Sequence, residues 1–166
     1  MIFIGIVTDT KSENYIKKIQ NNNDIFNKYH IIFIKEKSIE NIKNIKFETI
    51  IINREFNAED SLNKLIAKAE YLIINEDIDA SISLLNDVNS NIITYGFNSK
   101  STITMSSVTE DSIQICVQRN ILSKQNEIEQ QEISLAKEAE SEIYDIMLLI
   151  SMLLIYNKND IKQVKF

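Results

Sequence analysis

Hydrophobic residues in the first hundred positions of this chain are gathered into short, unbroken runs. Five such runs cover Ile2 to Val7, His30 to Lys35, Thr49 to Asn53, Tyr71 to Ile74 and Ile92 to Tyr95. Apolar runs of this length without alternation are typical of strands that are covered on both faces, as in a parallel sheet. We therefore predict five strands of a mostly parallel sheet.

The segments between these runs carry apolar residues at helical spacing. The first helix is expected to begin at a capping box, Thr10 to Glu13, and to continue to about Gln20 with Ile16 and Ile19 facing inward. Three more helices are predicted, at Ser38 to Asn44, at Ala58 to Lys68, and over Ile82 to Val88 with Asp79 or Ser81 as its N-cap. Strand and helix alternate through Gly96, which predicts a three-layer α/β fold of the Rossmann-like or P-loop-like kind.

The hydrophobic period changes after Gly96. Apolar residues now alternate with polar ones, at Ile103 and Met105 and again from Ile113 to Ile121. Such alternation is typical of half-exposed antiparallel strands, so a small antiparallel β-meander is predicted from Thr102 to Leu135. Its hairpin turn would be Thr109 to Asp111, and a shift of apolar parity predicts a break near Gln130.

A helix is predicted near the end of the chain, from about Glu140 to Asn157, and it is apolar almost all round. Such a helix is either covered on both sides by its own domain or faces a partner, so a homodimer or a protein partner at this helix is one expectation. Its apolar part, Ile143 to Tyr156, contains Asp145 and is shorter than the roughly 20 residues that a bilayer requires. We therefore expect no membrane span.

Composition narrows the class of protein. The 166 residues, 44% hydrophobic and 25% charged, are expected to form a single domain, 1–166. A net charge of −6 with only two arginines argues against a nucleic-acid partner. One cysteine, Cys116, excludes an internal disulfide, and one histidine, His30, excludes a Ser-His-Asp triad or a histidine metal cluster. The first residues lack the basic region of a signal peptide, so a cytoplasmic location is expected.

The loop after the first predicted strand, Gly5 to Ser12, matches the P-loop pattern except that Thr10 replaces the glycine before Lys11. In a P-loop, backbone N–H groups, the lysine and the Ser or Thr hydroxyl hold phosphate and Mg²⁺. The replaced glycine lets the backbone approach phosphate closely, and Asp9 adds negative charge at the same place. This pattern indicates a capped helix start in a loop that has lost nucleotide binding.

Two strand ends, Asn75-Glu76-Asp77 and Tyr95-Gly96, are followed by small antiparallel strands and an apolar helix. In this order and spacing the stretch from Ala69 to Tyr156 resembles the latter half of the central domain of Mur ligases, the ATP-dependent amide ligases that extend the peptide of cell-wall precursors. The family's P-loop glycines are absent here, and Ser141, Glu142 and Asp145 look like the positions of its His-Asn pair and a following Asn. What the resemblance implies is therefore shared ancestry without ligase activity, and no cofactor is expected.

Polar residues also follow the predicted strand ends, where ligands bind in open α/β sheets. The candidate ligand-binding residues are Thr8, Lys11, Ser12, Asn53, Asn75, Asp77, Tyr95 and Asn98. Ordinary polar loops are the alternative, and carboxylates such as Asp77 could hold Mg²⁺ or cap the next helix; we predict no catalytic and no metal-binding residue. Three functions stay open: a non-catalytic Mur-ligase-like binding or scaffolding module near cell-wall metabolism, a small-molecule or nucleotide sensor, and a subunit of a multi-chain ligase-like enzyme.

Overall fold

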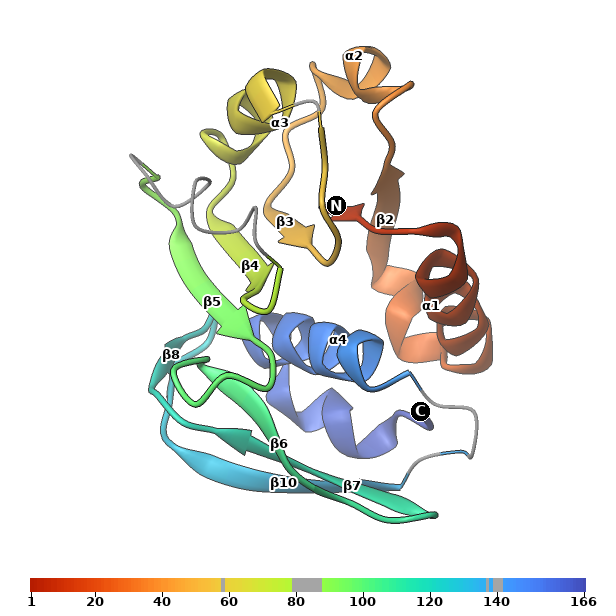
Figure 1. Cartoon of the computed structure of the whole chain (residues 1–166), viewed down its shortest axis with the longest axis vertical. Helices are drawn as coiled ribbons and strands as arrows, with labels where there is room; N and C mark the ends of the chain where they lie inside the picture. Colours follow the sequence, from red (N-terminus) through yellow and green to blue (C-terminus); the bar gives the residue numbers. More distant parts are fainter. Residues whose placement is uncertain (58, 79–87, 137, 139–141) are drawn as a thin grey trace.

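A computed structural model describes residues 1–57, 59–78, 88–136, 138 and 142–166 (Figure 1). Its main strands are β1 (Ile2–Val7), β2 (Tyr29–Ile34), β3 (Thr49–Ile52), β4 (Tyr71–Asn75), β5 (Asn91–Tyr95), β6 (Ile103–Val108), β7 (Ser112–Val117) and β10 (Gln131–Ala136), with β8 (Ile121–Leu122) and β9 (Glu127–Ile128) as a separate pair. The helices are α1 (Thr10–Asn22), α2 (Ile39–Ile42), α3 (Glu59–Ile66) and α4 (Ile143–Tyr156), and the 3-10 helices include η1 (Asp24–Lys28) and η4 (Lys158–Gln163). The helix predicted with its N-cap at Asp79 or Ser81 lies outside the described residues.

All eight main strands belong to one sheet, in the order β10-β7-β6-β5-β4-β3-β1-β2. The strands from β2 to β6 pair in parallel, whereas β6, β7 and β10 pair antiparallel. The predicted antiparallel meander is therefore confirmed, and it continues the parallel sheet through the pairing of Tyr95 with Ile103. The strand order reverses between β1 and β3, which is where ligands bind in folds of this topology.

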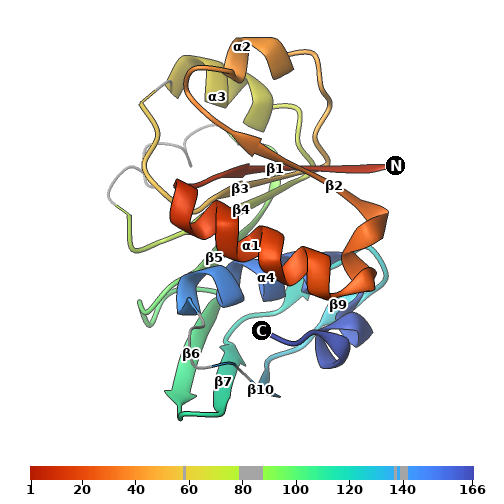
Figure 2. The same cartoon turned by 90° about the vertical axis from the view of Figure 1, so that its right-hand side faces the viewer.

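Helices cover both faces of the parallel part of the sheet, which confirms the three-layer prediction. One apolar core lies between the sheet and α2 and α3, and it includes Ile50, Leu62 and Leu72. The other lies between the sheet and α1 and α4, and it includes Ile4, Ile16 and Ile150. Figure 2 shows α1 and α4 together below the parallel strands and α2 and α3 above them.

The apolar circumference of α4 is covered by the chain itself. Every residue from Asp145 to Tyr156 is buried, and the helix contacts β4, β5, β6, β8, α1 and η4. In Figure 1 it lies between the parallel strands and the antiparallel strands, because the sheet curls around it. The hydrophobicity of α4 was expected to reflect either burial within its own domain or contact with a partner. Burial within its own domain is observed, and association through this helix stays a prediction.

Two local details differ from the sequence prediction or refine it. The N-cap of α1 is Asp9, whose carboxylate accepts a hydrogen bond from Ser12 N, so the predicted capping box from Thr10 to Glu13 is wrong by one residue. Both aspartate and threonine are good N-caps, and adjacent candidates cannot be separated by pattern alone. The predicted break near Gln130 is confirmed, since β9 ends at Ile128 and β10 begins at Gln131.

Candidate functional site

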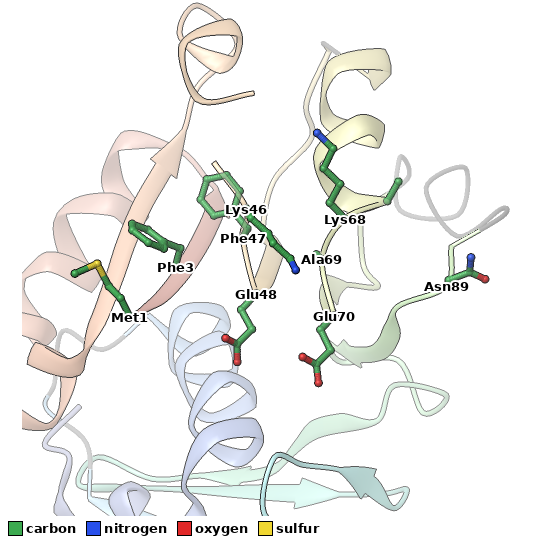
Figure 3. Close-up of a pocket in the computed structure, with 10 residues that line it drawn as sticks. Met1, Phe3, Lys46, Phe47, Glu48, Lys68, Ala69, Glu70 and Asn89 are labelled. Carbon is green, nitrogen blue, oxygen red and sulfur yellow. The ribbon is translucent and has the colours of Figure 1, made fainter. Parts of the chain in front are cut away.

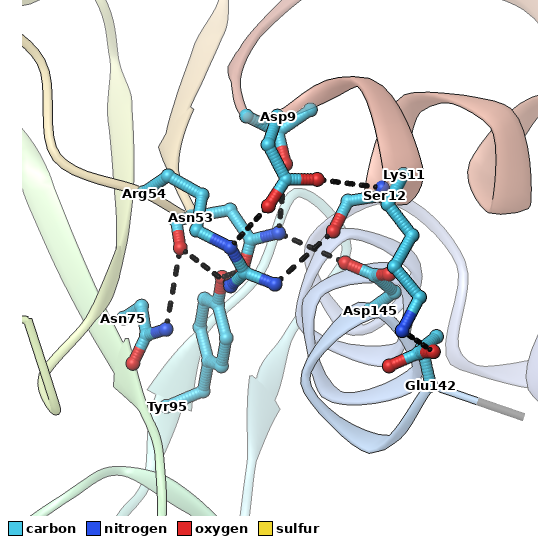
Figure 4. Close-up of polar contacts among 10 residues, drawn as sticks. Asp9, Lys11, Ser12, Asn53, Arg54, Asn75, Tyr95, Glu142 and Asp145 are labelled. Atoms are coloured by element: carbon cyan, nitrogen blue, oxygen red, sulfur yellow. Dashed lines mark hydrogen bonds and ion pairs between the residues drawn. The ribbon is translucent and has the colours of Figure 1, made fainter.

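The polar residues at the carboxyl ends of β1, β3, β4 and β5 meet around Asn53, which is fully buried directly after β3 (Figure 4). Its side-chain amide donates to Thr8 Oγ1 at 3.0 Å and to Asp145 Oδ1 at 2.8 Å. Its side-chain oxygen accepts from the hydroxyl of Tyr95 at 2.6 Å, and its backbone oxygen accepts from Asn75 Nδ2 at 3.3 Å. Asn53 therefore joins the ends of four strands of the sheet to α4.

Arg54 continues this network toward the start of α1. Its Nε donates to Asp9 Oδ2 at 2.8 Å, and its terminal nitrogens donate to Asn53 O at 3.0 Å and to Ser12 Oγ at 3.2 Å. Burial opposes the charge of Asp9, but the hydrogen bond from Ser12 N and the pairing with Arg54 outweigh burial and lower the pKa of Asp9. The Asp9 carboxylate thus stays charged at the N-terminus of α1, where the helix dipole also favours an anion.

Lys11 points away from the α1 N-terminus toward the first turn of α4. Its Nζ lies 2.5 Å from Glu142 Oε1, and this contact raises the pKa of Lys11. Figure 4 shows the lysine side chain running along the outside of the cluster to reach Glu142. The lysine of the P-loop-like pattern is therefore engaged by a carboxylate of the same chain.

Asp145 is a buried carboxyl group in the first turn of α4, with no exposed surface. Its Oδ1 accepts from Asn53, whereas Oδ2 accepts no hydrogen bond from the described residues. Burial raises the pKa of Asp145, and this effect exceeds the opposing effects of Ser12, Asn53 and Arg54. The first turn of α4 therefore holds an acid that is easier to protonate in the folded chain than in water.

A second, more exposed group surrounds Asp77, in the turn after β4. The Asp77 carboxylate accepts from Phe97 N at 2.7 Å and from the hydroxyl of Tyr144 at 3.0 Å. Burial and the Asp77 carboxylate raise the pKa of Tyr144 to about 12. The rings of Phe97 and Tyr144 meet edge to face with centroids 5.1 Å apart. Gly96 has a φ of 154°, and a Cβ built there would lie 2.7 Å from Asp77 Oδ2, so the turn requires glycine.

The structure brings most of the predicted site residues together. Thr8, Ser12, Asn53, Asn75 and Tyr95 meet in the network around Asn53 and Arg54. Lys11 and Asp77 lie at its margins, in contact with residues of α4 or the residue before it. Asn98 is separate, because its side chain is exposed and accepts from Lys100 N within its own turn. Whether any of these eight residues binds a ligand stays a prediction.

Asp145, Glu142 and Tyr144 were not among the candidate ligand-binding residues predicted from the sequence. Asp9 was considered only as a negative charge that opposes phosphate binding. A signal for Asp145 was present, since it is a carboxylate near the start of an otherwise apolar helix. Such a residue must find polar partners when its helix is buried. Which strand would supply them could not be inferred, because Asn53 is 92 positions away in the chain.

Two clefts flank the ends of the parallel strands. One of about 500 Å³ adjoins the cluster and is lined by the loops after β1, β2 and β3, including Thr8, Asp9, Lys37, Glu55 and Phe56. The other, of about 370 Å³, lies at the opposite ends of the strands beside Phe3, Phe47 and Ala69 (Figure 3). The larger cleft lies at the strand-order reversal, so we consider it the better place for a small ligand. Within the described residues, no three His, Cys, Asp or Glu side chains are grouped as a metal site would require.

In fold, the chain is similar to two solved structures from Acinetobacter baumannii. One match is the UDP-N-acetylmuramoylalanyl-D-glutamyl-2,6-diaminopimelate--D-alanyl-D-alanyl ligase from Acinetobacter baumannii, with a TM-score of 0.61, 10% sequence identity, and alignment over 98% of this chain and 45% of that chain. A second structure, of MurF from the same organism, matches with a TM-score of 0.59, 10% identity, and 98% and 44% coverage. The chain thus spans less than half the length of these ligases.

No protein-family model matches the sequence. No curated protein matches it either. The likeness to the ligases is therefore one of fold, and it extends over nearly the whole chain, beyond the stretch from Ala69 to Tyr156 that carries the resemblance in sequence. None of the described helices is long and apolar enough to cross a bilayer.

Proposed function

We propose that this chain is a non-catalytic module of Mur-ligase-like fold that acts as a binding or scaffolding unit, in the cytoplasm and near cell-wall synthesis. The observation that carries the proposal is the position of the Asp9 carboxylate. It accepts from Ser12 N at the start of α1 and from Nε of Arg54, both at 2.8 Å. A nucleotide phosphate at this helix N-terminus would meet a carboxylate already bonded to the groups that would hold it.

The other elements of the P-loop-like pattern support the same proposal. Lys11 is paired with Glu142 and does not point at the helix N-terminus. Gly5 lies inside β1 between Ile32 and Ile50 of the neighbouring strands, and its missing side chain makes room for Ile34 and Phe47. Its role is therefore packing. The residues present do not fit a nucleotide phosphate.

A sensor of a small molecule is the second candidate, and the cleft of about 500 Å³ favours it, because this volume lies within the usual range of ligand pockets. The third candidate, a subunit of a multi-chain ligase-like enzyme, is supported by the similarity of fold to the ligases alone.

A thermal-shift screen separates the three candidates. It uses Mg·ATP, other nucleotides and cell-wall precursors, because a ligand that binds only the folded chain raises the melting temperature by mass action. The scaffolding proposal predicts no shift with any of them. A shift with a precursor or a nucleotide other than ATP would favour the sensor. A shift with Mg·ATP, followed by ADP release after a partner from cell extract is added, would favour the enzyme subunit.

A further inference from the structure

The eight-stranded sheet ends at β10, whose free side adjoins a groove. The described part of the chain pairs this strand only with β7, so alternate backbone N–H and C=O groups of β10 face away from the sheet. A groove of about 440 Å³ is lined by the consecutive residues from Gln131 to Ser134 and by η4. Successive side chains of a strand point to opposite faces. A groove that touches four consecutive residues therefore runs along the edge of the strand and reaches its backbone.

The walls of this groove combine an apolar floor with two lysines of η4 and one carboxylate of β10, Glu132, which accepts a hydrogen bond from Gln114 Nε2 at 2.8 Å. Ile133 of β10 is half-buried and Ile161 of η4 is buried, and both line the groove. Lys158 and Lys162 line it from η4, their side chains are exposed, and within the described residues neither is found in an ion pair. In Figure 1, η4 lies between α4 and the strands β7 and β10. Lys158 and Lys162 border the outer strand of the sheet, because they line the same groove as residues 131–134.

A second groove of about 350 Å³ continues the first, because Gln131 and Lys158 line both. Glu127 and Glu129 line this continuation. Carboxylates therefore lie before β10 and, at Glu132, within it, whereas the lysines lie on the η4 side of both grooves. Partners that add a strand to a sheet edge obtain affinity from main-chain hydrogen bonds and specificity from pockets for alternate side chains.

We propose that the free edge of β10 and the groove beside η4 bind an extended peptide segment of another protein. The segment adds a strand to the sheet, inserts an aliphatic side chain between Ile133 and Ile161, and presents carboxylates to Lys158 and Lys162. This inference deepens the proposed binding role of the chain and rests on it. Its test measures peptide binding and the test of the proposed function measures nucleotides and precursors, so the two can fail separately.

The test selects short random peptides displayed on phage against the full-length chain and measures the affinity of an enriched synthetic peptide by fluorescence polarisation. Enriched sequences are expected to alternate aliphatic and acidic residues. The double variant Lys158→Glu, Lys162→Glu should weaken binding about tenfold or more, which corresponds to loss of about 1.4 kcal/mol. The matched control Lys64→Glu, Lys100→Glu changes the charge equally at exposed lysines elsewhere and should leave the affinity unchanged.

Nuclear magnetic resonance of the labelled chain then locates the peptide, and amide shifts are expected in β10 and η4. Thermal melting of both double variants confirms that each is folded. Enrichment without acidic residues, equal binding by both double variants, or amide shifts confined to another part of the chain would overturn the proposal. Dimerisation of the chain through β10, detected by sedimentation and unaffected by the peptide, would replace the peptide with a second copy and would overturn it as well.

Discussion

Asp9 and Arg54 form an ion pair where the strand order of the sheet reverses, with Arg54 Nε donating to Asp9 Oδ2 over 2.8 Å. The other oxygen of the same carboxylate accepts from Ser12 N. One side chain therefore serves both the N-terminus of α1 and the guanidinium group. We propose that the loop does not bind phosphate, because a phosphate would compete with Asp9 for both of these partners.

The raised pKa of the buried Asp145 carboxyl group leads us to expect an unusual pH dependence of stability. Its folded-state pKa is raised by burial, so its contribution to stability is fully present below the unfolded pKa and is lost as the pH rises through the folded pKa. Asp145→Asn keeps the oxygen that accepts from Asn53 and removes the buried charge. We expect the variant to be more stable than wild type at neutral pH, by about 1–3 kcal/mol, because one carboxylate oxygen is buried without a hydrogen-bond partner among the described residues.

Urea unfolding at several pH values checks this expectation. The difference between the variant and wild type should shrink as the pH falls. A variant that is less stable than wild type at neutral pH would show that the charged form of Asp145 stabilises the fold.

Gly96→Ala should destabilise the chain by about 1–3 kcal/mol, because alanine is strained at a φ of 154° and its Cβ would meet the Asp77 carboxylate. Gly5→Ala is the matched control. Its Cβ would lie equally close, at 2.7 Å, to Ile34 Cδ1, but this atom is the end of a side chain that can move. We expect a smaller loss of unfolding free energy for Gly5→Ala in chemical denaturation. The reverse order of the two losses would refute the role given to the turn after β5.

Tyr95→Phe removes the hydroxyl that donates to Asn53 Oδ1 at 2.6 Å in the buried network. The expected loss is about 1 kcal/mol, and Asn53→Ala should lose more because it also leaves Asp145 without its donor. A double-mutant cycle should give a coupling of at least about 0.5 kcal/mol, since the two residues share one network. Additive losses would mean that the hydrogen bond contributes nothing of its own.

Substitutions of Leu149 distinguish a role of α4 in folding from a role in association with a partner. It is fully buried in α4 by its own chain, so Leu149→Ala should lower stability by about 2–5 kcal/mol, and Leu149→Glu should unfold the chain. Circular dichroism and light scattering report the two properties together. A folded Leu149→Glu variant with a lower mass than wild type would instead support the homodimer through this helix.

Much of the fold was predictable because strand burial is local in sequence. The unbroken run from Tyr71 to Ile74 and the alternation after Ile113 each identify the kind of strand they form. The joining of the two parts into one sheet was not predictable, because it depends on a single parallel pairing of Tyr95 with Ile103. Because the curl of the sheet also depends on this pairing, the sequence alone did not decide whether α4 is buried by its own sheet or by a partner.

The location of the candidate site was predictable from the sequence. Its hydrogen-bond network was predictable only in part. Residues that follow parallel strands lie at one edge of the sheet. This rule predicts that Thr8, Asn53 and Asn75 lie close together, and their hydrogen bonds show that they do. Hydrogen-bond partners depend on side-chain orientation and long-range packing. The pairs of Lys11 with Glu142 and of Asn53 with Asp145 join positions that no local pattern relates.

Isothermal titration of Mg·ATP into the wild-type chain, with ADP release measured on the same sample, tests the central claim most directly. We expect no binding heat and no turnover for wild type, because Asp9 occupies the N-terminus of α1. Asp9→Gly, which frees Ser12 N and Arg54, serves as the companion variant and should bind inorganic phosphate or ATP more tightly than wild type. Micromolar binding of Mg·ATP by wild type, together with ADP release, would contradict the account.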